Sequence, residues 1–313
     1  MRKILGIICL ILLIFITFGY YYWSSKATKL QVGSLHTDIS LTKPKLRLIA
    51  MGDYGTGDEN QAKVAAAMER YCQQYGLDGL LLLGDNVYMD GVASLEDPKW
   101  DIAVWQPLGS PCLSQVPLYP ILGNHDYKGS TEAQIAMTAK NPRWHMPNRF
   151  YSIKFGNLLK VVGLDTNICD FCFDPKLCVL DFLKQSLGHD DSHWTFVMGH
   201  HPVSSASSKH KDNFQGKVLK RFLCDKADAY LAGHSHHLEF RKEEDCQADL
   251  FISGAGGASL YPPLEDPKSV FAAGEFGFLA IDVSRDTLEY KFFNYKDELL
   301  YTHTVSRTSE GTH

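Results

Sequence analysis

Five short segments of the chain combine a glycine with side chains that bind metal ions. In chain order they are Gly52-Asp53-Tyr54-Gly55, Gly84-Asp85-Asn86-Val87-Tyr88, Gly123-Asn124-His125-Asp126, Gly199-His200-His201-Pro202 and Gly233-His234-Ser235-His236. Carboxylate and amide oxygens combined with imidazole nitrogens suit iron, manganese or zinc, whereas a thiolate site would be built from cysteines. The residue types therefore predict a metal site with oxygen and nitrogen ligands.

Each of these segments alone has an ordinary structural explanation. A Gly-Asp turn is common, and a single Gly-His pair carries as little information. Asn124-His125-Asp126 is more specific, because this combination is seldom needed for packing. His234 and His236 are also informative, since alternate side chains of an extended segment lie on the same side. Five such segments in one chain favour a shared chemical role.

The elements that must position these segments are apolar stretches, each of which precedes one of them and is predicted to be a strand. These stretches are Leu46 to Met51, Gly79 to Leu83, Leu118 to Leu122, Thr195 to Met198 and Ala229 to Ala232. Helical periodicity at 59–75 and 214–224 alternates with strands, and the last third of the chain is richer in strands. The pattern predicts an α/β layered domain with one large mixed sheet or two packed sheets. Loops at strand ends would then gather at one sheet edge.

The composition is that of an ordinary globular protein. Hydrophobic residues make up 45% of the 313 residues and charged residues 21%, with a formal net charge of −5. A mildly acidic chain does not have the basic surface of a general nucleic-acid binder, so we expect no nucleic-acid partner. An anionic substrate would have to be attracted by a local positive site.

The N-terminus predicts export from the cytoplasm. Arg2 and Lys3 precede an apolar run at 4–23, which is long enough for a bilayer core and ends in aromatic residues. Residues 1–26 are therefore either a signal peptide or a membrane anchor, and both lead to an extracytoplasmic (secreted, periplasmic or lumenal) location. We further expect a polar tether at 27–44, a catalytic domain at 45–304, a tail at 305–313 and a monomer.

Export permits disulfide bonds. Of eight cysteines, seven follow the apolar run, so at least one of these is unpaired or bonded to another chain. Cys169, Cys172 and Cys178 have a spacing that zinc sites also use, but no second Cys-x2-Cys pair completes four ligands. Disulfides or buried thiols are the preferred interpretation there.

The order of the five segments resembles the calcineurin-like metallophosphoesterases. Tyr88 narrows the resemblance to the purple acid phosphatases, and the small size is similar to the tartrate-resistant type. The resemblance covers 46–282 and implies a four-layer α/β/β/α sandwich with two mixed sheets. One departure is the short segment after Asp165, which holds three cysteines where the mammalian type has a long loop.

The resemblance also implies a ligand set. Asp53, Asp85, Tyr88 and His236 would bind Fe³⁺, and Asp85, Asn124, His200 and His234 would bind a divalent ion, Fe²⁺, Zn²⁺ or Mn²⁺. Asp85 would bridge the two ions, and a hydroxide between them would attack the phosphorus. Asn124, His125 and His201 would contact the substrate.

Among the histidines, His125 would protonate the leaving alkoxide, although it could instead orient Asp126 or a water. His201 has either a substrate contact or a hydrogen bond within its loop. His237 would point away from the metals, and His210 would be solvated in a polar loop.

The chemistry of such a site follows from its charges. Two cations with a total charge of about +5, against two carboxylates, a phenolate and a hydroxide, leave roughly +1 for binding a phosphate group. The sequence therefore predicts a binuclear acid phosphatase that hydrolyses phosphate monoesters. The alternatives are a divalent-metal phosphodiesterase, against which Tyr88 argues, and an inactive membrane-tethered binding protein, against which the intact ligand set argues.

Overall fold

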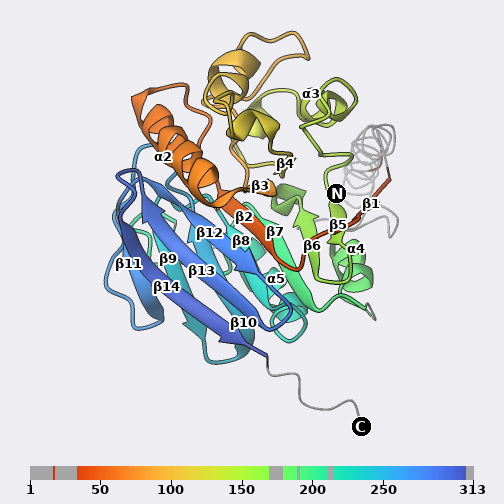
Figure 1. The fold of residues 1–313 in the computed structure, drawn as a ribbon, viewed down its shortest axis with the longest axis vertical. Helices are drawn as coiled ribbons and strands as arrows, with labels where there is room; N and C mark the ends of the chain where they lie inside the picture. The colour runs from red at the N-terminus through yellow and green to blue at the C-terminus, as the bar shows by residue number, and fades with distance from the viewer. Residues whose placement is uncertain (1–16, 18–33, 169–178, 189–190, 211–213, 308–313) are drawn as a thin grey trace, which may run out of the picture.

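The computed structural model describes residues 17, 34–168, 179–188, 191–210 and 214–307 (Figure 1). Their strands are β1 His36–Ile39, β2 Leu46–Met51, β3 Gly79–Leu82, β4 Leu118–Pro120, β5 Tyr151–Phe155, β6 Leu159–Leu164, β7 Trp194–Gly199, β8 Ala229–Ala232, β9 Leu238–Glu243, β10 Cys246–Ser253, β11 Ser269–Ala273, β12 Gly277–Val283, β13 Thr287–Asn294 and β14 Leu299–Ser306. The α-helices are α2 Glu59–Tyr75, α3 Thr131–Ala136, α4 Val179–Ser186 and α5 Phe214–Leu223. Single helical turns lie at Asp101–Trp105, Leu113–Gln115, Asp126–Lys128, Met137–Ala139 and Thr166–Ile168.

These strands form two mixed sheets. One sheet has the order β1-β5-β6-β7-β8-β10-β9-β11, and the other has the order β14-β13-β12-β2-β3-β4. Within the first, β6, β7, β8 and β10 are parallel, and within the second, β2, β3 and β4 are parallel. The fold is therefore a mixed α/β structure with two sheets.

Helices cover the outer faces of the two sheets. Val64, Met68 and Tyr71 of α2 belong to a core that also contains apolar residues of both sheets. A second core joins α4 and α5 to the outer face of β6, β7 and β8, for example through Leu183 and Leu219. The order of layers is helix, sheet, sheet, helix, as Figure 1 shows.

The long helix α2 illustrates how the local sequence sets these elements. The Asp58 side chain accepts hydrogen bonds from the backbone N–H groups of Asn60 and Gln61, so the helix begins with a side-chain cap. Gly76 ends it with a φ of 76°, a conformation that costs glycine little. The helix bounds match those predicted from sequence.

Four strands were not predicted. β1 lies within the expected tether at 27–44 and pairs in parallel with β5. β5, β9 and β11 were also missed. β9 alternates apolar and charged residues, and its charged side chains are nearly all buried in ion pairs. β11 is only half-buried.

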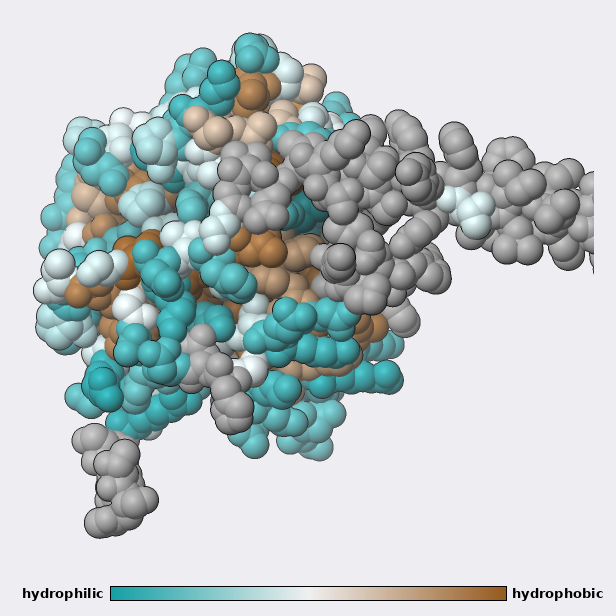
Figure 2. Space-filling model, turned by 90° about the vertical axis from the view of Figure 1, so that its right-hand side faces the viewer, coloured by the Kyte–Doolittle hydropathy of each residue, from teal (hydrophilic) through white to brown (hydrophobic). Residues whose placement is uncertain are grey.

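The N-terminal apolar run lies outside the described residues apart from Thr17, so the predicted signal or membrane helix stays a prediction. Among the described residues, no helix combines the length and apolar character needed to span a bilayer. On the face shown in Figure 2, hydrophobic residues form several separate areas between hydrophilic ones.

Two disulfide bonds support the predicted oxidising compartment. Cys72 of α2 is bonded to Cys112, and Cys224 is bonded to Cys246 at the start of β10. Disulfides persist in extracytoplasmic environments. Cys169, Cys172 and Cys178 lie outside the described residues, so the zinc and disulfide interpretations of that segment remain untested.

Candidate metal centre

The five ligand-rich segments follow the carboxyl ends of five strands. β2, β3 and β4 are parallel in one sheet, and β7 and β8 are parallel in the other. Parallel strands release their loops at the same edge, and these five loops meet there through direct contacts. Gly52 to Gly55 and Gly84 to Tyr88, for instance, exchange backbone hydrogen bonds from Asp53 N to Gly84 O and from Tyr88 N to Gly55 O.

The backbone at this edge is strained where ligands are expected. Asp53, Asp85 and His234 all have positive φ angles, of 56°, 54° and 66°. Such angles are uncommon for residues with a side chain and cluster at functional sites. The surrounding contacts fix these three residues in place.

Two glycines are required by close approach. A Cβ at Gly123 would lie 2.2 Å from Asp85 Oδ1, and a Cβ at Gly233 would lie 2.6 Å from Asp53 Oδ2. Both distances are shorter than any real contact of this kind, so a side chain there would displace a carboxylate. The glycines let the loops approach the two acids.

One group of side chains surrounds the Tyr88 hydroxyl. Its oxygen lies 3.1 Å from Asp53 Oδ1, 2.8 Å from Asp85 Oδ2 and 3.2 Å from His236 Nε2. His236 Nε2 is also 3.3 Å from Asp53 Oδ1. The structure thus brings together all four residues predicted to bind the ferric ion.

A second group surrounds the Asn124 side chain. Its oxygen is 3.1 Å from His200 Nε2 and 3.0 Å from His234 Nδ1, and these two nitrogens are 3.3 Å apart. His200 Nε2 is 3.5 Å from Asp85 Oδ1. Asp85 therefore faces Tyr88 with one oxygen and His200 with the other, the position expected for a residue shared by two metal sites.

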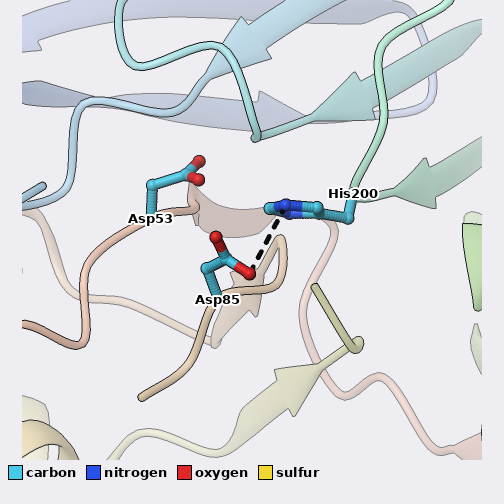
Figure 3. A group of neighbouring side chains, drawn as sticks. All are labelled: Asp53, Asp85 and His200. Atoms are coloured by element: carbon cyan, nitrogen blue, oxygen red, sulfur yellow. Dashed lines mark ion pairs between the residues drawn. The ribbon is translucent and has the colours of Figure 1, made fainter. Parts of the chain in front are cut away.

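Asp53, Asp85 and His200 point toward one another (Figure 3), and one ligand atom from each lies within 4.8 Å of the others. All three are buried. Buried carboxylates are costly without a compensating cation. The geometry fits a metal site, and it draws on donors from both sheets.

Electrostatics prepare these side chains to bind cations. Burial would raise the pKa of Asp53, but contacts with His236, His200 and the backbone N–H of His234 hold it below its usual value. Burial and the positive field of the other histidines lower the pKa of His234, so its ring is neutral. Burial raises the pKa of Tyr88 well above its usual value, with Asp53 and Asp85 adding to the effect. A neighbouring cation is what would let this phenol lose its proton.

His125 lies beside this group. Its backbone N–H donates to Asp85 Oδ1 at 2.8 Å, and its ring centre is 4.4 Å from that of Tyr88. Its Nδ1 lies 2.7 Å from the Met89 carbonyl oxygen. The same Nδ1 lies 3.1 Å from Lys128 Nζ, so it has a partner on two sides, and Nε2 is the ring nitrogen left for a substrate.

His201 is buried behind the site. It is 7% exposed, its Nδ1 is 2.7 Å from Thr166 Oγ1, and the Tyr230 hydroxyl donates to its carbonyl. Burial, with the neighbouring His200, lowers the pKa of His201 to about 3. The His201 ring is neutral and buried, and its centre lies 4.5 Å from that of the His234 ring. This favours the interpretation that His201 makes a hydrogen bond within its loop over the interpretation that it contacts the substrate.

His210 was expected to be solvated, and that expectation was wrong. Its ring is half-buried, with its centre 4.2 Å from that of His234 and 5.4 Å from that of Tyr261. Tyr261 stacks on His236 at 4.1 Å. Neither residue carries a sequence signal, because each comes from a loop that contacts the site only after folding.

Asp126 holds two of the loops together. Its carboxylate accepts from the backbone N–H groups of Gly123 and Asn86 at 2.8 and 3.1 Å, and from Gln134 Nε2 at 2.8 Å. The fourth residue of the third segment is thus a support and not a ligand. His237, as predicted, points away from the cluster, since it is fully buried with Nε2 at 2.8 Å from Glu239.

Comparison with known proteins places the chain in a family. The model of the calcineurin-like phosphoesterases matches residues 35–238. Human tartrate-resistant acid phosphatase type 5 is 32% identical over 240 residues, which cover 68% of this chain and 73% of that protein. The chain is a purple acid phosphatase homologue of the calcineurin-like metallophosphoesterase family. This confirms the resemblance inferred from the five segments.

Other relatives agree with this placement. Purple acid phosphatase 4 of Arabidopsis thaliana is 26% identical over 289 residues, which cover 84% of each chain. The structure of a purple acid phosphatase from yellow lupin superposes on this one with a TM-score of 0.68 at 16% identity, covering 85% of this chain and 54% of that one. A second solved structure, the GAP50 anchor of the Plasmodium inner membrane complex, gives a TM-score of 0.76 at 23% identity, covering 86% and 91%. At these identities the two structures show the fold alone.

Proposed function

We propose that this purple acid phosphatase homologue is an active binuclear enzyme that hydrolyses phosphate monoesters. The ions would be Fe³⁺, held by Asp53, Asp85, Tyr88 and His236, and a divalent Fe, Zn or Mn ion, held by Asp85, Asn124, His200 and His234. The relatives are acid phosphatases by name, and the ligand types are those such ions prefer.

One observation carries this proposal. Asp53 is fully buried and Asp85 is 1% exposed, yet among the ion pairs of the described residues neither has an Arg or Lys partner. Their only neighbours of positive character are imidazoles. Two carboxylates buried in this way, with no Arg or Lys partner among the described residues, favour bound cations.

When bound, such a metal pair supplies a water-derived nucleophile and neutralises charge on the phosphoryl oxygens. The chain itself has to orient the ester and handle the leaving group. Asn124 stands between His200 and His234 at the centre of the site, so its amide is suited to fix one phosphoryl oxygen as well as a metal.

Two histidines are candidates to protonate the leaving alkoxide. Nδ1 of His125 is engaged by the Met89 carbonyl oxygen and by Lys128 Nζ, so its Nε2 is the nitrogen available to the substrate. His210 packs against His234 from the opposite loop. We assign the proton donor to His125, because its backbone is anchored directly on Asp85, and a positioning or binding role to His210.

The test is hydrolysis by metal-replete protein of phenyl phosphate and of a matched diester, bis(phenyl) phosphate. The proposal expects turnover of the monoester in mildly acidic solution and little turnover of the diester. Preference for the diester would favour the phosphodiesterase alternative. No turnover of either ester, with metal bound, would favour the inactive binding protein.

The proposed setting of the enzyme is extracytoplasmic, with residues 1–26 as a signal peptide or an anchor. The two disulfides are consistent with it. We also propose a monomer, with residues 27–44 linking the N-terminal segment to the catalytic domain at 45–304 and a tail at 305–313. Gel filtration and N-terminal sequencing of the exported protein test these assignments.

A further inference from the structure

Two loops pack beside the proposed metal ligands. Residues 202–210 and 259–264, here called the outer wall, are joined by a backbone hydrogen bond from Leu264 N to Ala206 O of 2.8 Å. Tyr261 N also donates to His236 O at 2.9 Å. The wall is thereby fixed to the ligand loop that carries His234 and His236.

A lysine stands at the outer end of this wall. Lys209 is exposed, and its Nζ lies 4.0 Å from the ring centre of Tyr261. Tyr261 stacks face to face on His236, with an interplanar angle of 10°. Lys209 is therefore separated from a proposed metal ligand by one aromatic ring.

A second lysine stands on the other side of the same ligands. Lys128 is exposed, and its Nζ lies 3.1 Å from His125 Nδ1. The His125 ring packs on Tyr88, whose hydroxyl contacts His236. A continuous series of contacts thus runs from Lys128 through His125, Tyr88, His236 and Tyr261 to Lys209.

Neither lysine has a carboxylate partner among the ion pairs of the described residues. Other lysines of this chain do: Lys63 pairs with Glu59, Lys184 with Asp181 and Lys291 with Asp282. The formal net charge of the chain is −5, so these two cations, which have no carboxylate partner among the described residues, work against the overall field. They create a local attraction for anions there.

We propose that Lys128 and Lys209 select phosphate esters whose leaving group carries a second anionic group. This inference rests on the proposed function for the site itself. The metal edge takes the phosphoryl group, the Tyr261 ring gives an apolar surface to the carbon skeleton, and the lysines bind the distant charge. A free phosphate or an ester with a neutral leaving group makes no use of the lysines.

The test compares two ligands that cannot be hydrolysed, phenylphosphonate and 4-phosphonobenzoate, by calorimetry on metal-replete protein. They differ only in the second anionic group. The expected affinity ratio in favour of 4-phosphonobenzoate is about ten, since each exposed charge pair is worth up to about threefold to fivefold. It should shrink toward one in 0.5 M salt, where exposed charges are screened.

Variants assign the effect to the two lysines. Lys128→Ala and Lys209→Ala should each lower the affinity ratio about threefold, and the double variant should bring it near one. Lys128→Arg and Lys209→Arg should keep most of it. Lys184→Ala is the matched control, because Lys184 also lies over an aromatic ring, Phe222 at 5.0 Å, but on α4 at the outer face of the sheet. It should leave the ratio unchanged.

The proposal is overturned if wild-type protein binds the two ligands equally, or if the ratio survives in the double variant. An equal fall in Lys184→Ala would also overturn it, since a general charge effect would then explain the result. These outcomes do not depend on turnover. Failure of the proposed function would appear separately, as absence of phenyl phosphate hydrolysis by protein that still discriminates between the two ligands.

Discussion

The buried acids at the metal edge, Asp53 and Asp85, and the buried acids of β9, Glu239 and Glu243, have different kinds of neighbouring side chain. Around the first pair lie a phenol and imidazoles. Around Glu239 and Glu243 lie arginine and lysine side chains. Arg241 Nη1 is 2.6 Å from Glu239 Oε1. Glu243 Oε2 accepts hydrogen bonds from Lys220 and Lys268 at 3.0 and 2.9 Å. Both regions bury carboxylates, but among the described residues only the β9 acids have Lys or Arg partners.

The difference shows what each region is for. The β9 network, consisting of Glu239, Arg241 and Glu243 with the side chains that bind them, also holds the outer wall. Arg241 Nε donates a hydrogen bond to Ser204, and Arg241 Nη2 lies 3.2 Å from Asp266 Oδ2. Glu239 accepts a hydrogen bond from the backbone N–H of Ala206. It is complete without a ligand. At the metal edge the described charge partners of Asp53 and Asp85 are histidines, which can also bind metals, so a bound cation can replace them as the compensating charge.

The largest expected effect is on activity. Asp85→Asn should lower turnover by about 10³-fold or more, because the carboxylate shared between the two proposed metal sites is lost. Metal content, measured by elemental analysis, should fall with activity. Full activity with normal metal content would mean that the two sites do not depend on Asp85.

The same variant sharpens the comparison in metal-free protein. Removing a buried charge that has no Lys or Arg partner among the described residues should leave the melting temperature of chelator-treated Asp85→Asn equal to or above that of the wild type. A clear fall in the melting temperature would show that the chain itself compensates this carboxylate.

Glu239→Gln should do the opposite. It leaves Arg241, only 2% exposed, without its closest charge partner, so we expect a loss of about 3 kcal/mol in the free energy of unfolding. Urea denaturation of chelator-treated protein measures this change. Metal stoichiometry should be retained, and loss of bound metal at normal stability would contradict the separation of the two regions.

A smaller effect is expected for His125→Ala. Metal should stay bound, and turnover of esters with poor leaving groups should fall by about 10²-fold, while esters with good leaving groups are affected much less. A series of aryl phosphates of graded leaving-group pKa measures this dependence. Equal slowing across the series would argue against proton donation by His125.

The smallest effect concerns the acid stability of the β9 network. Burial alone would raise the pKa of Glu243, but hydrogen bonds from Ser204, Lys268 and Lys220 lower it to about 2. A lowered pKa stabilises the fold above the ordinary value near 4.5 and loses this contribution as the pH falls toward 2.

The variant Glu243→Gln tests this pH dependence of the stability. It should cost about 1 kcal/mol at pH 7, a modest value because the lysine partners are partly exposed to solvent, and the difference from wild type should narrow below pH 4. Denaturation curves at several pH values measure it. A difference that is constant with pH would mean that the Glu243 charge makes no contribution.

Much of this arrangement is predictable from sequence because its signals are local. An apolar run followed by Gly-Asp or Gly-His specifies a strand and the loop at its end, and the helix bounds of α2 follow from Asp58 and Gly76. The parallel pairing that brings the loops to one edge follows from alternation of strands and helices. The coming together of Asp53, Tyr88 and His236 was expected on this basis together with the family resemblance.

The remainder depends on contacts between distant parts of the chain. β9 carries Glu239, Arg241 and Glu243, which read as solvent-facing charges until their partners on other loops are known. His210 lies in a polar stretch, and it packs on His234 from the outer wall, whose two loops are joined by the hydrogen bond from Leu264 N to Ala206 O. Charge pairing over long sequence distances leaves no periodic signal.

Metal analysis combined with a visible absorption spectrum tests the central claim most directly. The account predicts about two metal ions per chain, at least one of them iron, and a visible band that is lost in Tyr88→Phe while the ions remain bound. Purified active protein with a single metal ion, or with iron but no band that depends on Tyr88, would contradict the assignment of two cations to this carboxylate pair.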